Sequence, residues 1–129
     1  MSVQNPFALH RQAVWKERAA NHAANPTMPQ WIRVASLAFG CHRRNGHANF
    51  KSGEIAEILG TPGKPLSASS VSNAIKLAKS AGWIAQESTA RCLVVPPHAV
   101  DGGIGHPNER CQIHGTPAST LHVPREKAG

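Results

Sequence analysis

The chain has 129 residues, and its 14 lysines and arginines against seven aspartates and glutamates give a formal net charge of +7 with the histidines neutral. This length suits one ordinary domain with short extensions, and the basic surface favours a polyanionic partner, either nucleic acid or an anionic membrane. The longest nearly unbroken apolar run, residues 34–41, is far shorter than the roughly 20 residues of a spanning helix, which excludes membrane insertion.

Residues 7–24 predict a first helix. The segment is rich in Ala, follows Pro6, and places Phe7, Val14 and Trp15 at spacings that share one helix face. This apolar stripe is thin, so we expect the helix to dock on another surface. That surface is either the core of its own chain or, through Trp15, a second copy in a homodimer.

Three shorter elements follow between breaks rich in Pro and Gly. Residues 29–43 predict a second helix with a broad apolar face, and residues 47–50 alternate polar and apolar as a short half-buried strand does. Residues 53–59 predict a short third helix that is capped by Ser52 and ended by Gly60.

A fourth helix is predicted after the Pro-rich loop 61–66. It runs to Ala81 from a cap at Ser67 or Ser69, and Gly82 then adopts the left-handed conformation that ends a helix. Its inward stripe follows the i, i+3, i+4, i+7 pattern and consists of Val71, Ala74, Ile75 and Ala78.

A β-hairpin is predicted next. Residues 83–85 begin one strand, the polar residues 86–90 form a turn, and residues 91–95 form a β-branched strand that a Pro-Pro pair ends. Residues 98–129 carry few large apolar side chains, so we expect a largely irregular and loosely held tail. The predicted fold class is therefore mainly α with a small β-hairpin (α+β).

Three segments of this pattern point to a known fold. The sequence Gly-Glu-Ile-Ala-Glu-Ile-Leu-Gly at 53–60 looks like the first helix of a helix-turn-helix, residues 69–79 look like its recognition helix, and Ala-Gly-Trp-Ile at 81–84 looks like the step into a wing. In this arrangement, residues 29–96 resemble the winged helix-turn-helix domain of DNA-binding proteins. The loop between the two helices is longer than the three to four residues usual for the motif. We therefore expect an N-terminal helix and linker at 1–28, a winged helix-turn-helix domain at 29–97 and a Gly- and Pro-rich tail at 98–129.

The outward side of the fourth helix has the composition that a major groove requires, because it is small, neutral or basic and carries no carboxylate. The same residues also suit a well-capped, soluble surface helix. We expect base contacts from Ser69, Ser70, Ser72, Asn73 and Lys76. Contacts to the DNA backbone are expected from the turns beside the fourth helix, from the end of that helix and from the wing. The residues are Arg43, Arg44, Lys51, Lys64, Lys79, Ser88, Thr89 and Arg91.

Most of the excess charge lies in this domain. Eight basic residues stand between Arg33 and Arg91, both included, against three acidic ones. The aromatic side chains Trp31, Phe39, Phe50 and Trp83 fall on predicted core faces, so we expect no stacking platform for single-stranded nucleic acid.

Metal binding is a second question that the histidines and cysteines raise. The Cys111-x-x-His114 pair has ligand-like spacing, although the overall spacing fits no standard zinc finger and a thiol within a strand is ordinary packing. We expect no cofactor, with zinc as the alternative. The five residues that could supply its four ligands are Cys92, His98, His106, Cys111 and His114.

Catalytic motifs are absent from the sequence, which has no HExxH and no P-loop, so we expect no enzyme. The expected function is sequence-specific binding of duplex DNA by a small transcriptional regulator. The alternatives are an accessory protein in phage or plasmid replication or maintenance, and a winged-helix module that docks to another protein. The N-terminus has no charged start followed by an apolar block, and three cysteines fit reduced thiols, so we expect a soluble protein of the cytoplasm.

Overall fold

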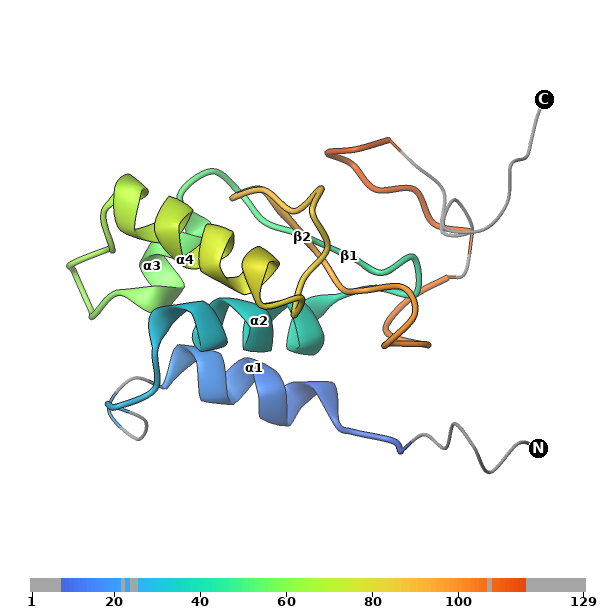
Figure 1. Cartoon of the computed structure of the whole chain (residues 1–129), viewed down its shortest axis with the longest axis horizontal. Coiled ribbons are helices and arrows are strands. Elements are labelled where there is room, and N and C mark those ends of the chain that lie inside the picture. The colour runs from blue at the N-terminus through green and yellow to red at the C-terminus, as the bar shows by residue number, and fades with distance from the viewer. Residues whose placement is uncertain (1–7, 22, 24–25, 107, 116–129) are drawn as a thin grey trace.

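The computed structural model describes residues 8–21, 23, 26–106 and 108–115. The ends of the first predicted helix, Phe7 and Ala24, and the last part of the tail, 116–129, lie outside these residues. The described chain forms four helices and two short strands, in the order α1 (Gln12–Ala20), α2 (Gln30–Cys41), β1 (His47–Asn49), α3 (Glu54–Leu59), α4 (Ala68–Ser80) and β2 (Cys92–Val94) (Figure 1). The predicted α+β class is confirmed. Within the described residues, the helices are too short or too polar to span a bilayer.

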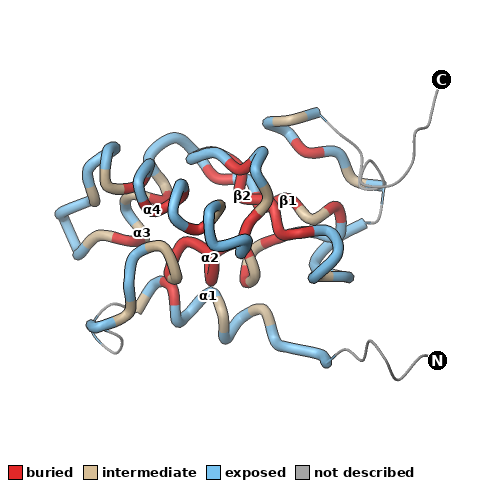
Figure 2. Tube along the Cα trace, in the orientation of Figure 1, coloured by how far each residue is buried: buried red, intermediate tan, exposed pale blue. Residues whose placement is uncertain are grey.

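Helix α2 is the centre of the structure, with α1 on one side and α4 on the other (Figure 1). Its residues are the most continuously buried of any helix (Figure 2). Gly40 lets α1 approach closely, because a Cβ at this position would lie 2.5 Å from the backbone nitrogen of Lys16. Trp15 of α1 meets Phe39 of α2 edge-on, with ring centroids 5.3 Å apart. The first helix therefore docks on its own chain, which is one of its two predicted destinations.

The two ends of α4 follow the predicted capping chemistry, whereas the start of α3 does not. Ser67 is the N-cap of α4, and its hydroxyl accepts a hydrogen bond of 3.2 Å from the backbone N–H of Ser70. Gly82 is left-handed with φ 77°, as predicted. Ser52 does not cap α3, so that prediction was wrong: Gly53 stands at the N-cap position with φ 81° and no side-chain cap bond forms.

The two short strands pair with each other in an antiparallel sheet, in the register His47↔Val94, Ala48↔Leu93 and Asn49↔Cys92. The predicted strand at residues 83–85 does not form, and its pairing with residues 91–95 is limited to one backbone hydrogen bond, from the N–H of Ala85 to the carbonyl of Val94 at 2.8 Å. The segment before β2 turns too tightly to form a strand. The Ser88 hydroxyl accepts the N–H of Val94 at 2.9 Å, where a strand partner would offer a carbonyl.

The described part of the tail contains neither helix nor strand, as expected, and several contacts attach it to the rest of the chain. It lies along the sheet end of the molecule, away from α3 (Figure 1). Val100 packs against the core, and the backbone N–H of Arg44 donates to the carbonyl of Ile104 at 2.7 Å. The Asn45 side chain donates to the carbonyl of Glu109 at 3.0 Å.

The core predictions hold for three of the four aromatic residues. Phe50 is buried, and Trp31 and Phe39 are partly buried against the core. Trp83 is 38% exposed, so its placement in the core was wrong. It lies three residues after the end of α4, and its ring packs on those of Trp31 and Phe39 at the edge of the core.

Candidate metal centre and the exposed face of helix α4

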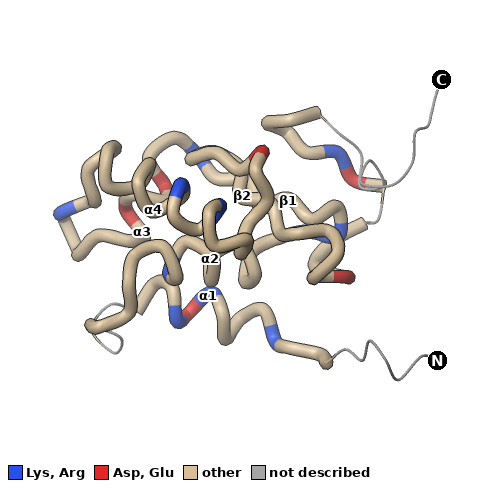
Figure 3. Tube along the Cα trace, in the orientation of Figure 1, with Lys and Arg blue, Asp and Glu red and all other residues tan. Residues whose placement is uncertain are grey.

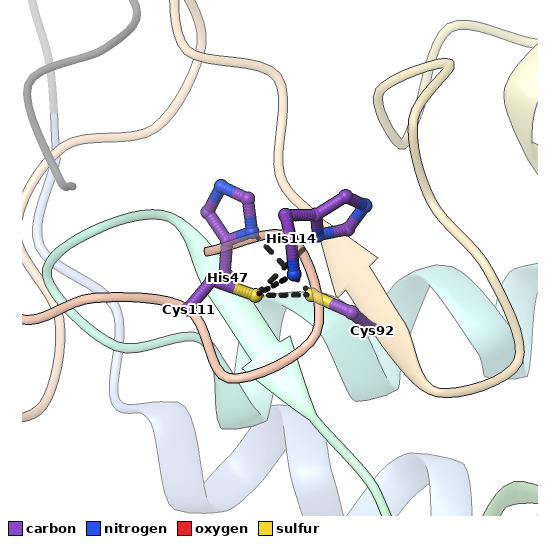
Figure 4. Close-up of side chains that lie close together, drawn as sticks. All are labelled: His47, Cys92, Cys111 and His114. Atoms are coloured by element: carbon purple, nitrogen blue, oxygen red, sulfur yellow. Dashed lines mark hydrogen bonds between the residues drawn. The ribbon is translucent and has the colours of Figure 1, made fainter. Parts of the chain in front are cut away.

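Four side chains of metal-binding type meet where the tail crosses the sheet. His47 comes from β1, Cys92 from β2, and Cys111 and His114 from the tail (Figure 4). We call this group the candidate metal centre. Its four ligand atoms, one nitrogen or sulfur from each residue, all lie within 4.8 Å of one another. The group could hold a metal ion.

The spacing of the atoms agrees with one shared ion. The two sulfur atoms of Cys92 and Cys111 are 3.4 Å apart, and each sulfur lies 3.4 Å from one histidine Nδ1, that of His47 or that of His114. Ligands placed tetrahedrally at metal distances of about 2.0–2.3 Å are separated by about 3.3–3.8 Å. These three separations therefore need little adjustment.

The strand register explains how β1 and β2 contribute. His47 and Asn49 point to the same side of the sheet as Cys92 and Val94, because side chains alternate along a strand and these residues are paired in register. Ala48 and Leu93 point to the other side and belong to the main core. One side of the sheet thus covers the core, and the other carries two ligands that the tail covers.

The tail supplies its two ligands from one tight turn. The Cys111 sulfur accepts hydrogen bonds from the backbone N–H groups of Ile113 and His114, at 3.3 and 3.2 Å, and from the side-chain amide of Asn49 at 3.1 Å. Burial acts to raise the pKa of the Cys111 thiol, but these bonds and the contact with His114 lower it to about 6. The turn therefore stabilises a thiolate, the form that binds metals.

A hydrogen bond orients the ring of His114, and burial favours the protonated form of Cys92. The Nε2 of His114 is 2.8 Å from the carbonyl oxygen of Glu87. A proton on Nε2 donates to this carbonyl and leaves the Nδ1 lone pair facing the centre, an arrangement usual for metal-binding histidines. Burial raises the pKa of the Cys92 thiol, so this cysteine is protonated unless a cation displaces its proton.

The prediction of metal ligands was right in part. The structure brings together Cys92, Cys111 and His114 of the five predicted residues, while His98 and His106 are exposed and lie outside the group. His47 completes the group and was missed. Only its place in the alternating segment 47–50 hinted at a role, and its partner Cys92 is 45 positions away.

The outward face of α4 is the second candidate site. Ser69, Ser72, Asn73 and Lys76 are exposed and Ser70 is half-buried. The predicted inward stripe of α4 is buried throughout. Leu77 is 55% exposed and was not predicted to face outward. Lysines lie on α4, while acidic residues lie on α3 and, as Glu87, in the segment between α4 and β2 (Figure 3).

The residues predicted to touch the DNA backbone have mixed surroundings. Those exposed to solvent are Arg43, Arg44, Lys51, Lys64, Thr89 and Arg91, and Lys79 is half-buried. Arg43 is paired with Glu109 at 2.6 Å, the one ion pair among the described residues. Arg91 donates from Nε to the carbonyl of Phe50 at 2.8 Å, which leaves its terminal nitrogens for other partners.

Two members of the predicted basic or polar surface are in the interior. Ser88 is buried, and its hydroxyl is used within the chain by Val94, so its predicted contact with DNA was wrong. Arg33 is only 1% exposed and adds nothing to the surface charge, although the sequence count included it. Its guanidinium instead donates to the carbonyls of Ala19 and Leu59 at 2.8 and 2.9 Å.

No protein-family model matches the chain, and no curated protein and no solved structure matches it either. What can be inferred of its function comes from the two sites themselves.

Proposed function

We propose that the protein binds duplex DNA sequence-specifically through α4, as a winged helix-turn-helix regulator does. The observation that supports this proposal is the outward face of α4, which is rich in hydroxyl groups, has no carboxylate and is left open by the described chain. A helix that enters a major groove needs short polar side chains for close approach and no negative charge against the phosphates.

The individual side chains on this face suit reading of base edges. The amide of Asn73 can pair with an adenine edge, and Lys76 can donate to the acceptors of guanine. Leu77 lies one helical turn after Asn73 and offers an apolar group for a thymine methyl. The exposed serines at the start of the helix can donate to phosphates or bases.

The surroundings of α4 support contacts to the DNA backbone. Lys64 lies in the loop before α4 and Arg91 in the loop before β2, and both are exposed. Cations in loops beside a groove-bound helix bind phosphates, which provides affinity without sequence preference. The helix pair α3–α4 followed by this loop and β2 agrees with part of the element order of the proposed fold, whereas the first strand of its wing, residues 83–85, does not form.

A salt titration tests the proposal. We expect the affinity for a random duplex to fall steeply with salt, with a log-log slope of about one for each phosphate contact. Selection of bound sites from a random duplex pool should return a preferred sequence. A flat salt response together with no enriched sequence would exclude this function.

Matched variants separate the two kinds of contact. Replacement of Asn73 and Lys76 with Ala should remove sequence preference, and each lost base contact should cost about 1–3 kcal/mol on the preferred site. Lys64→Ala should weaken all duplexes alike. Lys16→Ala is the control, because α1 lies on the far side of α2 from α4 (Figure 1) and its exposed lysine should not matter.

A protein-interaction module is the second candidate function. The exposure of Leu77 on α4 and of Trp83 just after it favours this candidate, because apolar side chains at a surface also mark protein contacts. Leu77→Ser separates the two functions. In a DNA-binding protein it should weaken only those sites that carry a thymine at the contacted position.

We propose further that the ion at the candidate metal centre is Zn²⁺. Two thiolates and two imidazoles in a tetrahedral arrangement are a usual zinc ligand set, and thiolates disfavour Mg²⁺ and Ca²⁺. Metal analysis of protein purified without added metal should find about one zinc per chain. Protein that contains no zinc and does not take it up would refute the assignment.

A further inference from the structure

We infer that the metal ion acts as a clasp: it joins His47 and Cys92 of the sheet to Cys111 and His114 of the tail, and so holds the described tail residues, 98–106 and 108–115, in place. The inference rests on the proposed Zn²⁺ and not on DNA binding.

The closed ligand set indicates a structural role. A catalytic zinc keeps one position open for water or substrate, whereas four protein ligands fill the tetrahedral shell of a structural one. Here four protein side chains are available, and His47, Cys92 and Cys111 are buried. Neither a water nor a substrate has a place on such an ion.

Apart from the candidate metal centre, the tail is attached mainly by hydrogen bonds and buries little apolar surface. The described residues from 98 onward include one buried side chain, that of Cys111, and Val100 is the one that packs partly buried against the main core. The ion pair of Arg43 with Glu109 has side-chain exposures of 44% and 31%, and pairs this exposed are weak. A segment with so little apolar burial depends on the ion for its order.

The residues around the ligands are placed to support the clasp. Asn49 of β1 bonds twice to the turn of the tail: its amide donates to the Cys111 sulfur at 3.1 Å, and its oxygen accepts the N–H of Gln112 at 3.0 Å. Hydrogen bonds to a coordinating sulfur orient it and tune its basicity. Asn49 is therefore a positioning residue for Cys111.

Binding is a proton-for-metal exchange at the sulfur atoms. Zn²⁺ replaces the proton of each thiol that carries one, two Zn–S bonds form, and the displaced protons pass to the solvent. The two neutral imidazoles donate lone pairs without losing a proton. No oxidant or reductant takes part.

Hydrogen–deuterium exchange of the full-length chain tests the clasp. Metal-free protein is titrated with Zn²⁺ alone, and we expect one equivalent to slow the exchange of residues 108–115 at least about tenfold, while α2 exchanges equally slowly in both states. Equal exchange of this segment with and without Zn²⁺ would overturn the inference, as would the absence of stoichiometric binding. Neither readout involves DNA, so a failure of the proposed DNA binding leaves both unchanged.

Co²⁺ provides a readout that does not depend on stability, because tetrahedral thiolate ligation gives intense visible bands and sulfur charge-transfer bands. Cys111→Ser should weaken these charge-transfer bands, and Asn49→Ala should lower the metal affinity about 10–100-fold while the bands remain. His106→Asn is the matched control, because His106 is exposed and lies outside the centre. If His106→Asn lowered the affinity as much as His114→Asn, the ligand assignment would be wrong.

Discussion

Replacement of Arg33 with Met should destabilise the protein, because this buried guanidinium joins the ends of two helices. Its Nε donates to Ala19 near the end of α1, at 2.8 Å, and its Nη1 donates to Leu59 at the end of α3, at 2.9 Å. The last carbonyls of a helix have no partner within the helix, and a cation there also opposes the helix dipole. Burial lowers the pKa of Arg33, but a guanidinium stays charged in any protein.

The size of the effect follows from the groups left behind. Each buried carbonyl that loses its donor costs about 1–3 kcal/mol, so two carbonyls cost about 2–6 kcal/mol. The guanidinium has no carboxylate partner in the described part of the chain, so its removal also relieves the cost of burying a charge and offsets part of this loss. We expect a net loss of about 2–3 kcal/mol. With a urea slope of about 1–1.5 kcal/mol/M for a small domain, the unfolding midpoint falls by about 2 M.

The assay is urea unfolding followed by circular dichroism with Zn²⁺ present throughout. Arg44→Met is the control, because Arg44 is exposed and its replacement should change the free energy of unfolding by less than about 0.5 kcal/mol. A midpoint for Arg33→Met within about 0.5 M of the wild type would refute the reasoning. It would mean that the free energy gained by no longer burying the guanidinium balances the loss of its hydrogen bonds to Ala19 and Leu59.

Three further predictions concern stability. Gly60→Ala should lower the melting temperature by about 8 °C or more in a thermal scan, because the added Cβ would lie 2.8 Å from the Cα of Pro65, and an unchanged value would contradict the close approach. Ser67→Ala should cost about 1 kcal/mol in urea unfolding through loss of the N-cap bond, whereas Ser72→Ala, exposed within the helix, should cost nothing. Burial lowers the pKa of His42 in the folded protein, so this side chain is held neutral while the same histidine in the unfolded chain, with a pKa of about 6.5, takes up a proton as the pH falls. The stability that His42 contributes is therefore complete above about pH 6.5 and is lost below it. His42→Asn should therefore flatten the decline in unfolding free energy between pH 7 and pH 5, and identical pH profiles would count against this origin.

Local patterns in the sequence were enough to predict that the four helices form and which face of α4 is buried, whereas Val14, placed on the buried face of the first helix, is exposed. The stripe of apolar side chains in α4 repeats with the helical period, and the hydroxyl of Ser67 and the left-handed Gly82 mark its two ends. These signals act within one or two turns of the chain, so they can be read without knowledge of the fold. The Cys111-x-x-His114 turn is local in the same sense and was predicted as a candidate.

The rest depended on contacts between distant segments. His47 lies next to Cys92 because β1 is the strand that pairs with β2, and the docking of the tail brings Cys111 to both residues. Arg33 has the sequence appearance of a surface cation, and only the meeting of α1, α2 and α3 places carbonyls around it. Polar side chains of this kind are buried when groups from elsewhere in the chain accept or donate their hydrogen bonds, and the spacing of residues along the sequence does not show which groups these are.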